Sequence, residues 1–460
     1  MPAAPTTQST DAVDQAVVKA SGTWRWNDYY LELVAREIST ISRHCDGVVQ
    51  FRPLGIDSGH LLERIECPQK RVAAIVDQDS NPFAEAARRL VVLNGNLNHT
   101  PDVQAFLAEL RTEVRRRDRV AAVLYNPYLH WLYRFANRVG VRRGELPRTF
   151  LTRADVDNVA RLAGFEVVRV RPVVHCPFRL AGLGTLVNWL LPAVALLRWM
   201  SLATVVVLRP IAAAEHRPSL SVVMPARNER DNIELAVRRL EKLAVPRLQL
   251  LLVEGGSSDG TWDEVERVAR RANGRVSVRS LQQPGRGKAD AVRFGFSQAT
   301  GDLVAVWDAD LAVEPELLQR FYNAYCQGLG DFVNGNRLVY PMEHGAMRFL
   351  NRLANGLLGR MLSYVLDEPR LRDALCGAKL FARCDWPRMA AWQAEYGGHD
   401  PFGDFDLLSA AAVLGLGIVE VPVPYRARVY GATNIRRFRD GWQLARLLVR
   451  GLLRIRMGRT

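Results

Sequence analysis

Strand-like and helix-like segments alternate along this chain in two separate runs, and this alternation constrains the fold more than any other feature. The first run has apolar, β-branched segments at residues 48–51, 72–76, 120–125 and 165–170. Before the last of these, Thr152 and Asp155 form a capping-box pattern that predicts a helix closed by Gly164. Strands that alternate with crossover helices build parallel sheets. Because the 460 residues also exceed the roughly 250 to 300 at which one core stops growing, we predict two α/β domains that meet near residues 212–218.

The second run places polar residues where apolar strands end. Its predicted strands are residues 220–224, 248–253 and 303–307. The second of them leads into the sequence EGGSSDGT, and the third leads into Asp308-Ala309-Asp310. Open α/β sheets bind their ligands at the carboxyl ends of parallel strands. The second domain is therefore predicted to carry a ligand site at that edge of its sheet.

Two carboxylates separated by one residue, Asp308 and Asp310, follow the third strand. Carboxylate oxygens suit a hard divalent cation, whose coordination shell phosphate oxygens and water can complete. We therefore predict that Asp308 and Asp310 bind Mg²⁺ or Mn²⁺. The alternative is an acidic entry to the helix that begins at Pro315, with no ligand bound.

Several further motifs occur in a fixed order around this triplet. They are SVVMPARNE at 221–229, VEGGSSDGT at 253–261, PGRGKADAVRFGF at 284–296 and WDADL at 307–311. In that order they resemble the inverting family 2 glycosyltransferases, in particular the dolichyl-phosphate mannose synthase-like members. CGAKLF at 376–381, FGDFDLL at 402–408 and RVYGATN at 428–434 extend the resemblance over residues 219–440. It implies a GT-A fold and a hexosyltransferase that uses a nucleotide-sugar donor.

The resemblance also implies roles for individual residues. Those that match the donor-binding motifs are Pro225, Ala226, Asn228, Glu229, Glu254, Asp259, Lys288, Asp308, Arg428 and Thr433, and those that match the metal motif are Asp308 and Asp310. The sequence departs from the family where paired aspartates are usual, because Glu254 and Gly255 stand there. This departure leaves the nucleotide base open. Growing negative charge on the leaving diphosphate needs cations, and Lys288, Arg286 and Arg428 are candidates.

Asp404 and Asp406 lie where the family carries its acceptor-side carboxylate. If the acceptor is a hydroxyl, one of them must act as general base. If the acceptor is a polyprenyl phosphate, it is already ionised at neutral pH, and the carboxylate would orient it or bind metal. The resemblance does not identify the sugar.

The first domain, residues 23–212, resembles the class I S-adenosylmethionine-dependent methyltransferases. Asp77 matches the acid that binds the cofactor ribose, and Gly55 and Gly59 match two glycines of the cofactor loop. Asp57 replaces the central glycine of that loop, and Pro53 replaces the acid before it. These departures indicate a degenerate domain kept for binding or structure. The alternative is a functional methyltransferase, alone or in a bifunctional methyltransferase/glycosyltransferase.

The methyltransferase-like pattern also lacks one strand. A predicted helix that ends near Leu90 runs directly into residues 91–99, where the family has an intervening strand with an adenine-contacting acid. This omission is a second reason to predict a Rossmann-like fold without full cofactor binding.

The most apolar stretch of the chain is residues 183–208. Pro192 and Arg198 interrupt it, and a central arginine costs about 2.5 to 3.5 kcal/mol on insertion scales. We therefore predict a buried helix followed by a buried strand at 202–209, with a membrane span as the alternative.

The C-terminal segment is strongly basic, with ten arginines and one acid, Asp440, between residues 426 and 460. A helix over 441–460 would place Leu444, Leu448, Leu452 and Ile455 on one face, opposite Arg446, Arg450 and Arg454. That pattern, with Trp442 near its start, predicts either a peripheral membrane element or a helix packed on its own domain. We expect no nucleic-acid partner for this basic segment.

The location of the protein is predicted from its cysteines and its first residues. Six scattered cysteines form no CxxC pair, which suits reduced thiols. Residues 1–22 are polar, lack a signal-peptide pattern and are expected to be disordered. We predict a cytoplasmic enzyme of cell-envelope synthesis, bound peripherally to the inner face of the cell membrane.

Overall fold

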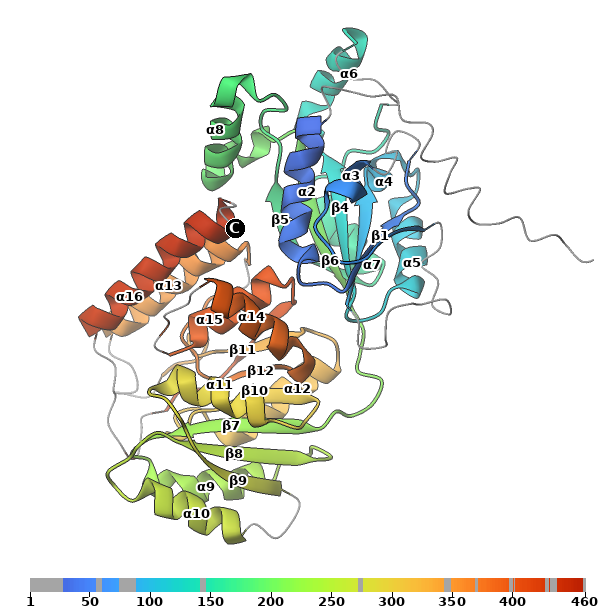
Figure 1. Ribbon diagram of the computed structural model, residues 1–460. Helices are drawn as coiled ribbons and strands as arrows, with labels where there is room; N and C mark the ends of the chain where they lie inside the picture. The colour runs from blue at the N-terminus through green and yellow to red at the C-terminus, as the bar shows by residue number, and fades with distance from the viewer. Residues whose placement is uncertain are drawn as a thin grey trace, which may run out of the picture. The chain divides into compact units, whose positions relative to one another are not determined.

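The computed structural model describes residues 28–54, 60–73, 88–140, 146–271, 276–342, 349–368, 371–396, 400, 402–426, 430 and 437–457. The chain divides into two compact units (Figure 1). Unit 1 runs from Met1 to Pro210 and unit 2 from Ile211 to Arg459. The predicted disordered segment at 1–22 lies outside the described residues.

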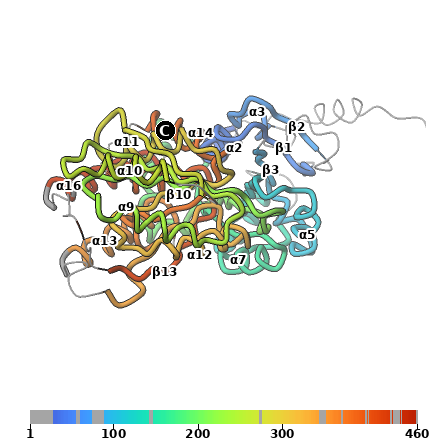
Figure 2. Tube along the Cα trace, turned by 90° about the horizontal axis from the view of Figure 1, so that it is seen from below, coloured from blue at the N-terminus to red at the C-terminus, as the bar shows by residue number. Residues whose placement is uncertain are grey.

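Unit 1 is built on a six-stranded sheet with helices on both faces. The strand order is β2 (Lys70–Ala73), β1 (Gly47–Phe51), β3 (Arg89–Asn94), β4 (Arg119–Tyr125), β6 (Ala203–Pro210) and β5 (Phe165–Pro172). Strands β1 to β4 are parallel, whereas β6 is antiparallel to both β4 and β5. Helices α2 (Asp28–Ser42) and α3 (His60–Arg64) cover one face, and α5 (Val103–Glu113) and α7 (Arg153–Leu162) cover the other (Figure 2).

The local predictions for this unit hold in part. The strands at 48–51, 120–125 and 165–170 are confirmed, and so is the capping box, because the Thr152 side chain accepts a hydrogen bond from the Asp155 backbone NH. The helix predicted to end near Leu90 is wrong at its end, because Leu90 lies buried in β3 between β1 and β4. The candidate cofactor residues Gly55, Gly59 and Asp77 lie outside the described residues.

The apolar stretch before β6 differs from the prediction. The strand is buried as expected, but α8 (Leu183–Leu190) and the 3₁₀ segments η3 (Leu191–Ala193) and η4 (Ala195–Met200) leave most of their large apolar side chains exposed. The prediction of a buried helix is therefore wrong. Among the described residues, no helix is long and apolar enough to span a membrane.

Unit 2 has a seven-stranded mixed sheet. The strand order is β13 (Ile418–Pro422), β11 (Phe332–Asn336), β12 (Lys379–Ala382), β10 (Leu303–Val306), β7 (Leu220–Ala226), β8 (Leu248–Glu254) and β9 (Val276–Gln282). Strands β10, β7, β8 and β9 are parallel, whereas β12 is antiparallel to both its neighbours. The predicted strands of this half are confirmed. Their carboxyl ends meet at one edge, where β12 begins.

Two hydrophobic cores hold the helices of unit 2 on opposite faces of its sheet (Figure 1). One core includes α9 (Arg230–Leu240), α10 (Thr261–Arg271) and α12 (Leu318–Cys326). The other includes α11 (Lys288–Gln298), α13 (Phe349–Leu366), α14 (Trp386–Tyr396) and α15 (Asp404–Val413). The helices that enter the ligand edge, α11 and α15, are thereby fixed by apolar packing.

The basic C-terminal segment forms α16 (Arg437–Gly451), which continues as the π-helical turn Leu452–Arg456 and lies alongside α13 (Figure 1). Leu444 and Leu448 are buried in the core of unit 2, and Leu452 and Ile455 pack against it. The predicted membrane face made of these leucines is therefore wrong, and the packed alternative is the one observed. The pattern suits both, because burial in a core and burial in lipid require the same apolar face.

Candidate active site

The loops after β7 and β8 are joined by a short hydrogen-bond network. Pro225 and Ala226 end β7, and Asn228 follows with a left-handed φ of 56°. The Asn228 NH donates to the Ser257 hydroxyl at 3.0 Å, and the Ser258 NH donates to the Asn228 side-chain oxygen at 3.0 Å. The predicted donor residues of the first two motifs are thus brought together.

Three acids accept hydrogen bonds within and next to these loops. Glu254 is buried and accepts from the Ser257 NH at 2.5 Å, while buried Glu229 accepts from the Asn232 side chain at 2.6 Å. Asp259 accepts from the Thr261 NH at 3.0 Å and from the Tyr430 hydroxyl at 3.3 Å. Burial raises the pKa of Asp259, but bonds from Thr261 and its neighbours outweigh burial and lower it. These carboxylates hold the loop in shape, and Tyr430 links the 428–434 motif to it.

A chain of alternating charges runs along the edge where β10 ends and β12 begins. The Lys288 ammonium lies 2.7 Å from Asp308 Oδ1 and 3.8 Å from Asp404 Oδ2. The Lys379 ammonium lies 2.7 Å from Asp404 Oδ1 and also donates to the Cys376 carbonyl. Burial lowers the pKa of Lys288, but the carboxylates of Asp308 and Asp404 outweigh it and raise the pKa. Lys288 therefore stays cationic at the centre of the site.

Gly377 allows the close approach of this charge chain. A Cβ built on Gly377 would lie 2.1 Å from Asp308 Oδ2 and 2.6 Å from the Lys288 Nζ atom. Any side chain at this position would push the ion pair aside. Residue 377 is thus as much a part of the site's geometry as the charged groups.

The second carboxylate of the triplet, Asp310, is nearly buried and accepts from the Ala312 NH at 3.1 Å. Among the described residues, no group of three His, Cys, Asp or Glu side chains could hold a metal ion. The oxygens of Asp308 and Asp310 suit a hard divalent cation chemically, provided that a phosphate ligand and water supply the remaining coordination.

The two predicted acceptor-side carboxylates lie at the start of α15. Asp404 joins the charge chain, whereas buried Asp406 accepts from Arg293 at 3.1 Å. Asp400, which lies just before the 402–408 motif, accepts from the Phe405 NH at 2.7 Å and so caps this helix. Burial and the Asp404 charge raise the pKa of Asp400. Both candidate bases, Asp404 and Asp406, therefore form ion pairs.

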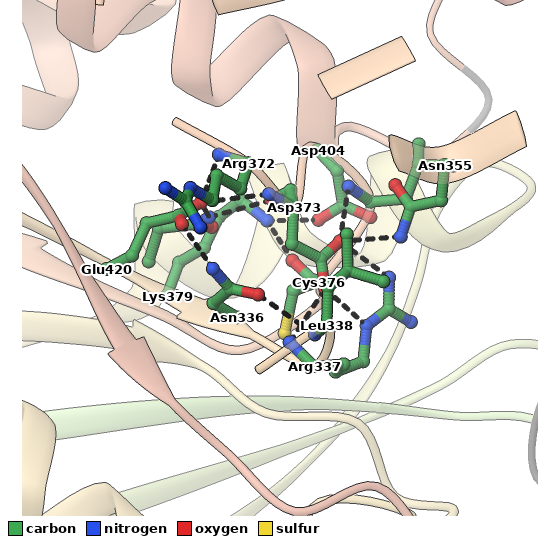
Figure 3. Close-up of polar contacts among 12 residues, drawn as sticks. Asn336, Arg337, Leu338, Asn355, Arg372, Asp373, Cys376, Lys379, Asp404 and Glu420 are labelled. Carbon is green, nitrogen blue, oxygen red and sulfur yellow. Dashed lines mark hydrogen bonds and ion pairs between the residues drawn. The ribbon is translucent and has the colours of Figure 1, made fainter. Parts of the chain in front are cut away.

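A second buried network, whose residues lie in none of the sequence motifs except for Cys376, Lys379 and Asp404, adjoins the charge chain (Figure 3). Arg337 donates to both oxygens of Asp373, at 2.8 and 2.9 Å, and the Asn355 amide of α13 donates to Asp373 at 2.9 Å. Despite burial, Arg337 lowers the pKa of Asp373 to about 2. Glu420 accepts from the Asp373 NH at 2.9 Å and from the Asn336 amide at 2.5 Å. The only signal in the sequence was the polar NGNR run that ends β11.

The remaining predicted residues, Arg428 and Thr433, lie outside the described part of the chain. The described donor-motif residues divide into two groups. Pro225, Ala226, Asn228, Glu229, Glu254 and Asp259 form the loop cluster of β7 and β8, while Lys288, Asp308 and Asp310 lie at the end of β10.

Residues 221–383, about a third of the chain, match the model of the family Glycosyl transferase family 2. The low-salt glycan biosynthesis hexosyltransferase Agl6 of Haloferax volcanii is 28% identical over 241 residues, which are 52% of this chain and 55% of that protein. The dolichyl-phosphate hexose transferase of the same organism is 26% identical over 52% of this chain and 96% of its own length. The chain thus spans about half the length of Agl6.

Two further similarities are more limited. The dolichol-phosphate mannosyltransferase of Pyrococcus furiosus is 31% identical over 155 residues, which are 34% of this chain and 42% of that protein. Among solved structures, the mannosyltransferase PcManGT from Pyrobaculum calidifontis in complex with GDP-Man and Mn²⁺ is 22% identical, over 53% of this chain and 66% of that chain, with a TM-score of 0.34.

Proposed function

We propose that the chain, whose residues 221–383 form a glycosyl transferase family 2 domain, is an inverting hexosyltransferase of GT-A fold that uses a nucleotide-sugar donor. The observation that carries this proposal is the charge chain Asp308–Lys288–Asp404–Lys379 at the carboxyl edge of the parallel strands. It lies beside the loop cluster of β7 and β8, where the nucleotide is proposed to bind.

The reaction breaks the bond between the sugar C1 and the diphosphate oxygen, and the nucleoside diphosphate leaves with the electron pair. An acceptor oxygen forms the new bond to C1 from the opposite face. Preorganised cations stabilise the charge that grows on the leaving group. Lys288 is the proposed cation, because it lies at the centre of the charge chain and Gly377 leaves no side chain above it.

Asp308 and Asp310 are proposed to hold Mg²⁺ or Mn²⁺ together with the donor diphosphate. The metal, when bound, would neutralise charge on the leaving group without a proton transfer. The Lys288 ammonium lies 2.7 Å from Asp308 Oδ1, so donor binding is proposed to be coupled to a rearrangement of that ion pair.

The acceptor is proposed to be a polyprenyl phosphate. A phosphate acceptor needs no general base, which fits the ion pairs made by both Asp404 and Asp406. Helix α13 contacts the site network through Asn355, and Leu353, Leu357 and Met361 are exposed at four-residue spacing along one side of it. An apolar acceptor chain could lie on that side while its phosphate reaches the charged edge. Relatives named as dolichyl-phosphate transferases also support this choice.

The methyltransferase alternative has less support. The matching family model lies entirely within unit 2, and the predicted S-adenosylmethionine residues lie outside the described part of unit 1. We propose that unit 1 is a degenerate Rossmann-like domain, and that the enzyme works at the inner face of the cell membrane. Calorimetric titration with S-adenosylmethionine should show no micromolar binding, and such binding would favour the bifunctional alternative.

The function is tested by incubating the full chain with a panel of nucleoside-diphosphate hexoses, with and without polyprenyl phosphate. We expect one donor to transfer its sugar to the lipid phosphate. The Lys288→Met variant should lose about 10² to 10³-fold in kcat, as removal of one charge-stabilising donor does elsewhere. Lys242→Met, which removes an exposed lysine after α9, should retain activity. Equal activity of the two variants would refute the assignment of Lys288.

A further inference from the structure

Helix α8 in unit 1 exposes its apolar face and turns its polar face toward the protein, which is the reverse of an ordinary surface helix. At 100° per residue, Leu183, Leu186 and Leu190 share one side, and their exposed fractions are 59%, 53% and 47%. The opposite side carries Asn188, which is half-buried, and Thr185, which is exposed but accepts a hydrogen bond from Tyr29 of α2. An ordinary surface helix would bury the leucines and expose the polar side.

The inward side is held by specific hydrogen bonds. The Asn188 side-chain oxygen accepts from the backbone NH groups of His175 and Cys176 at 2.8 and 2.9 Å, and its amide donates to the Cys176 carbonyl at 2.7 Å. The Tyr29 hydroxyl of α2 donates to Thr185 at 3.2 Å. At Gly184 even a Cβ would collide with the Phe178 carbonyl, at 1.8 Å. These bonds and the close contact at Gly184 fix the orientation of α8, with its leucines facing outward.

The apolar surface continues beyond α8. The turn at Pro192 and the segment η4 add exposed side chains at Val194, Leu196, Trp199 and Met200, of which Leu196 is 79% exposed. Together these seven residues form an extended apolar patch, whereas soluble monomers usually expose apolar side chains singly. Because α8 has eight residues and the chain turns back at Pro192, the patch can enter a membrane surface but cannot cross it.

A second element projects from the same edge of the sheet. The segment η1 (Pro127–Leu129) and helix α6 (His130–Arg138) follow β4, while η4 precedes β6, and Tyr125 of β4 pairs with Ala203 of β6. The Asn126 amide donates to the Trp199 carbonyl at 2.5 Å, which links the η1–α6 segment to the α8–η4 segment. Figure 1 shows α6 and α8 at the same end of unit 1.

The side chains of this second element fit a membrane surface. Tyr128, Trp131 and Phe135 are each about 60% exposed, and aromatic side chains favour the boundary between lipid and water. Helix α6 also adds positive charge. The described residues 127–140 contain two exposed arginines and no acid, whereas Arg179 near α8 pairs with Glu32 of α2.

We propose that α6 together with the α8–η4 segment forms a monotopic membrane-docking surface of unit 1, which inserts its apolar side chains into the headgroup boundary of an anionic bilayer. The occupant is a lipid surface because the patch combines an outward apolar face, flanking aromatic residues and the exposed arginines Arg134 and Arg138 of α6. This inference does not depend on the proposed glycosyl transfer, since it concerns the other unit and is measured without a donor.

The test measures the partition of the full chain onto vesicles of phosphatidylcholine, with and without phosphatidylglycerol, by titration of lipid. We expect the Leu186→Ser/Leu196→Ser double variant to lose about tenfold in partition coefficient for each leucine. The matched control is Leu162→Ser/Leu235→Ser, which removes two exposed leucines from α7 and α9 and should partition like the wild type. All substituted positions are exposed, and circular dichroism checks that each variant is folded.

A charge variant separates the electrostatic part of the binding. Arg134→Gln/Arg138→Gln removes two exposed arginines of α6 and should weaken binding about fivefold for each, only on phosphatidylglycerol-containing vesicles and only at low salt. Absence of vesicle binding by the wild type would overturn the proposal, because the patch would then be covered by protein. Partition of the leucine variant within about threefold of its control would overturn it as well.

Discussion

Gly377 offers the sharpest test of the proposed charge chain, because a single methyl group there acts on the site and on little else. The change is Gly377→Ala. The added Cβ would lie 2.1 Å from Asp308 Oδ2 and 2.6 Å from the Lys288 Nζ atom, whereas ordinary contacts begin at 3.4 Å. Asp308 must therefore retreat by about 1.3 Å, and both colliding atoms are at the ends of flexible side chains. The φ of Gly377 is not positive, so alanine can adopt the backbone conformation.

The expected effect is large on catalysis and small on stability. A misplacement of about 1 Å in a positioned group costs about 10²-fold in rate, which corresponds to about 2.7 kcal/mol. The Lys288–Asp308 pair is partly exposed, with side chains 24% and 37% accessible, so its disturbance should change the free energy of unfolding by less than about 1 kcal/mol. We therefore expect kcat/KM to fall about a hundredfold with little change in Tm.

The assay follows nucleoside-diphosphate release with the best donor of the panel, next to denaturant unfolding of the same preparation. Gly356→Ala in α13 is the matched control, because its added Cβ meets no atom within 4 Å. The control should keep full activity. If Gly377→Ala retains kcat/KM within about threefold, the ion pair is not part of the transition-state machinery. If it instead loses more than about 3 kcal/mol of stability, the clash falls on the fold and the argument fails.

Four further outcomes follow from the structure. Asp310→Ala should abolish transfer with an unchanged Tm, and EDTA should mimic it; transfer by the variant in metal-free buffer would contradict the metal site. Lys379→Met leaves Asp404 buried without its nearest cation, so we expect about 3 to 5 kcal/mol less stability in urea, and a loss below about 1 kcal/mol would contradict this. The pKa of Asp373 is lowered to about 2, so this carboxylate stabilises the fold by about 2 kcal/mol above about pH 4, and that stabilisation is lost as pH falls through 2. Asp373→Asn should therefore flatten the dependence of the free energy of unfolding on pH in this range. An unchanged dependence would show that Asp373 is not its source. Truncation after Phe438 should unfold unit 2, as seen by circular dichroism, because it removes buried Leu444; a folded truncated chain would contradict this.

The parts of the site that the sequence predicted are those set by local order along the chain. A buried strand followed by a polar loop fixes where Asn228, Glu254 and Asp308 lie, because parallel strands end at a common edge. Such short-range patterns can be interpreted without knowing which residues are in contact in the folded protein. The strands of unit 2 and the loop cluster of β7 and β8 were therefore within reach.

The parts that it missed depend on partners distant in sequence. Lys379 begins a short strand that pairs antiparallel with β10, and its register with Val306 brings it to the ligand edge. Arg337 and Asp373 are 36 residues apart, and neither lies in a recognisable motif. A buried charge needs a partner, but the sequence does not say which opposite charge provides it. Only the sheet order supplies that information.

Apolar periodicity likewise leaves the partner undetermined. It predicts that one face of a helix is buried, but not whether protein or lipid buries it. The leucines of α16 suited a membrane element and a packed helix equally and proved to pack in the core of unit 2, whereas those of α8 were predicted to be buried and proved to be exposed. The polar side of each helix tells the two cases apart. In α8 the polar side is satisfied by backbone groups of the protein through Asn188, so the helix is anchored by its hydrogen bonds and its leucines need another partner. In α16 Arg446 and Arg450 face solvent, so the leucines provide the anchor. The direction in which the hydrogen-bonding side points, and not the strength of the apolar pattern, therefore decides which helix is available to a membrane.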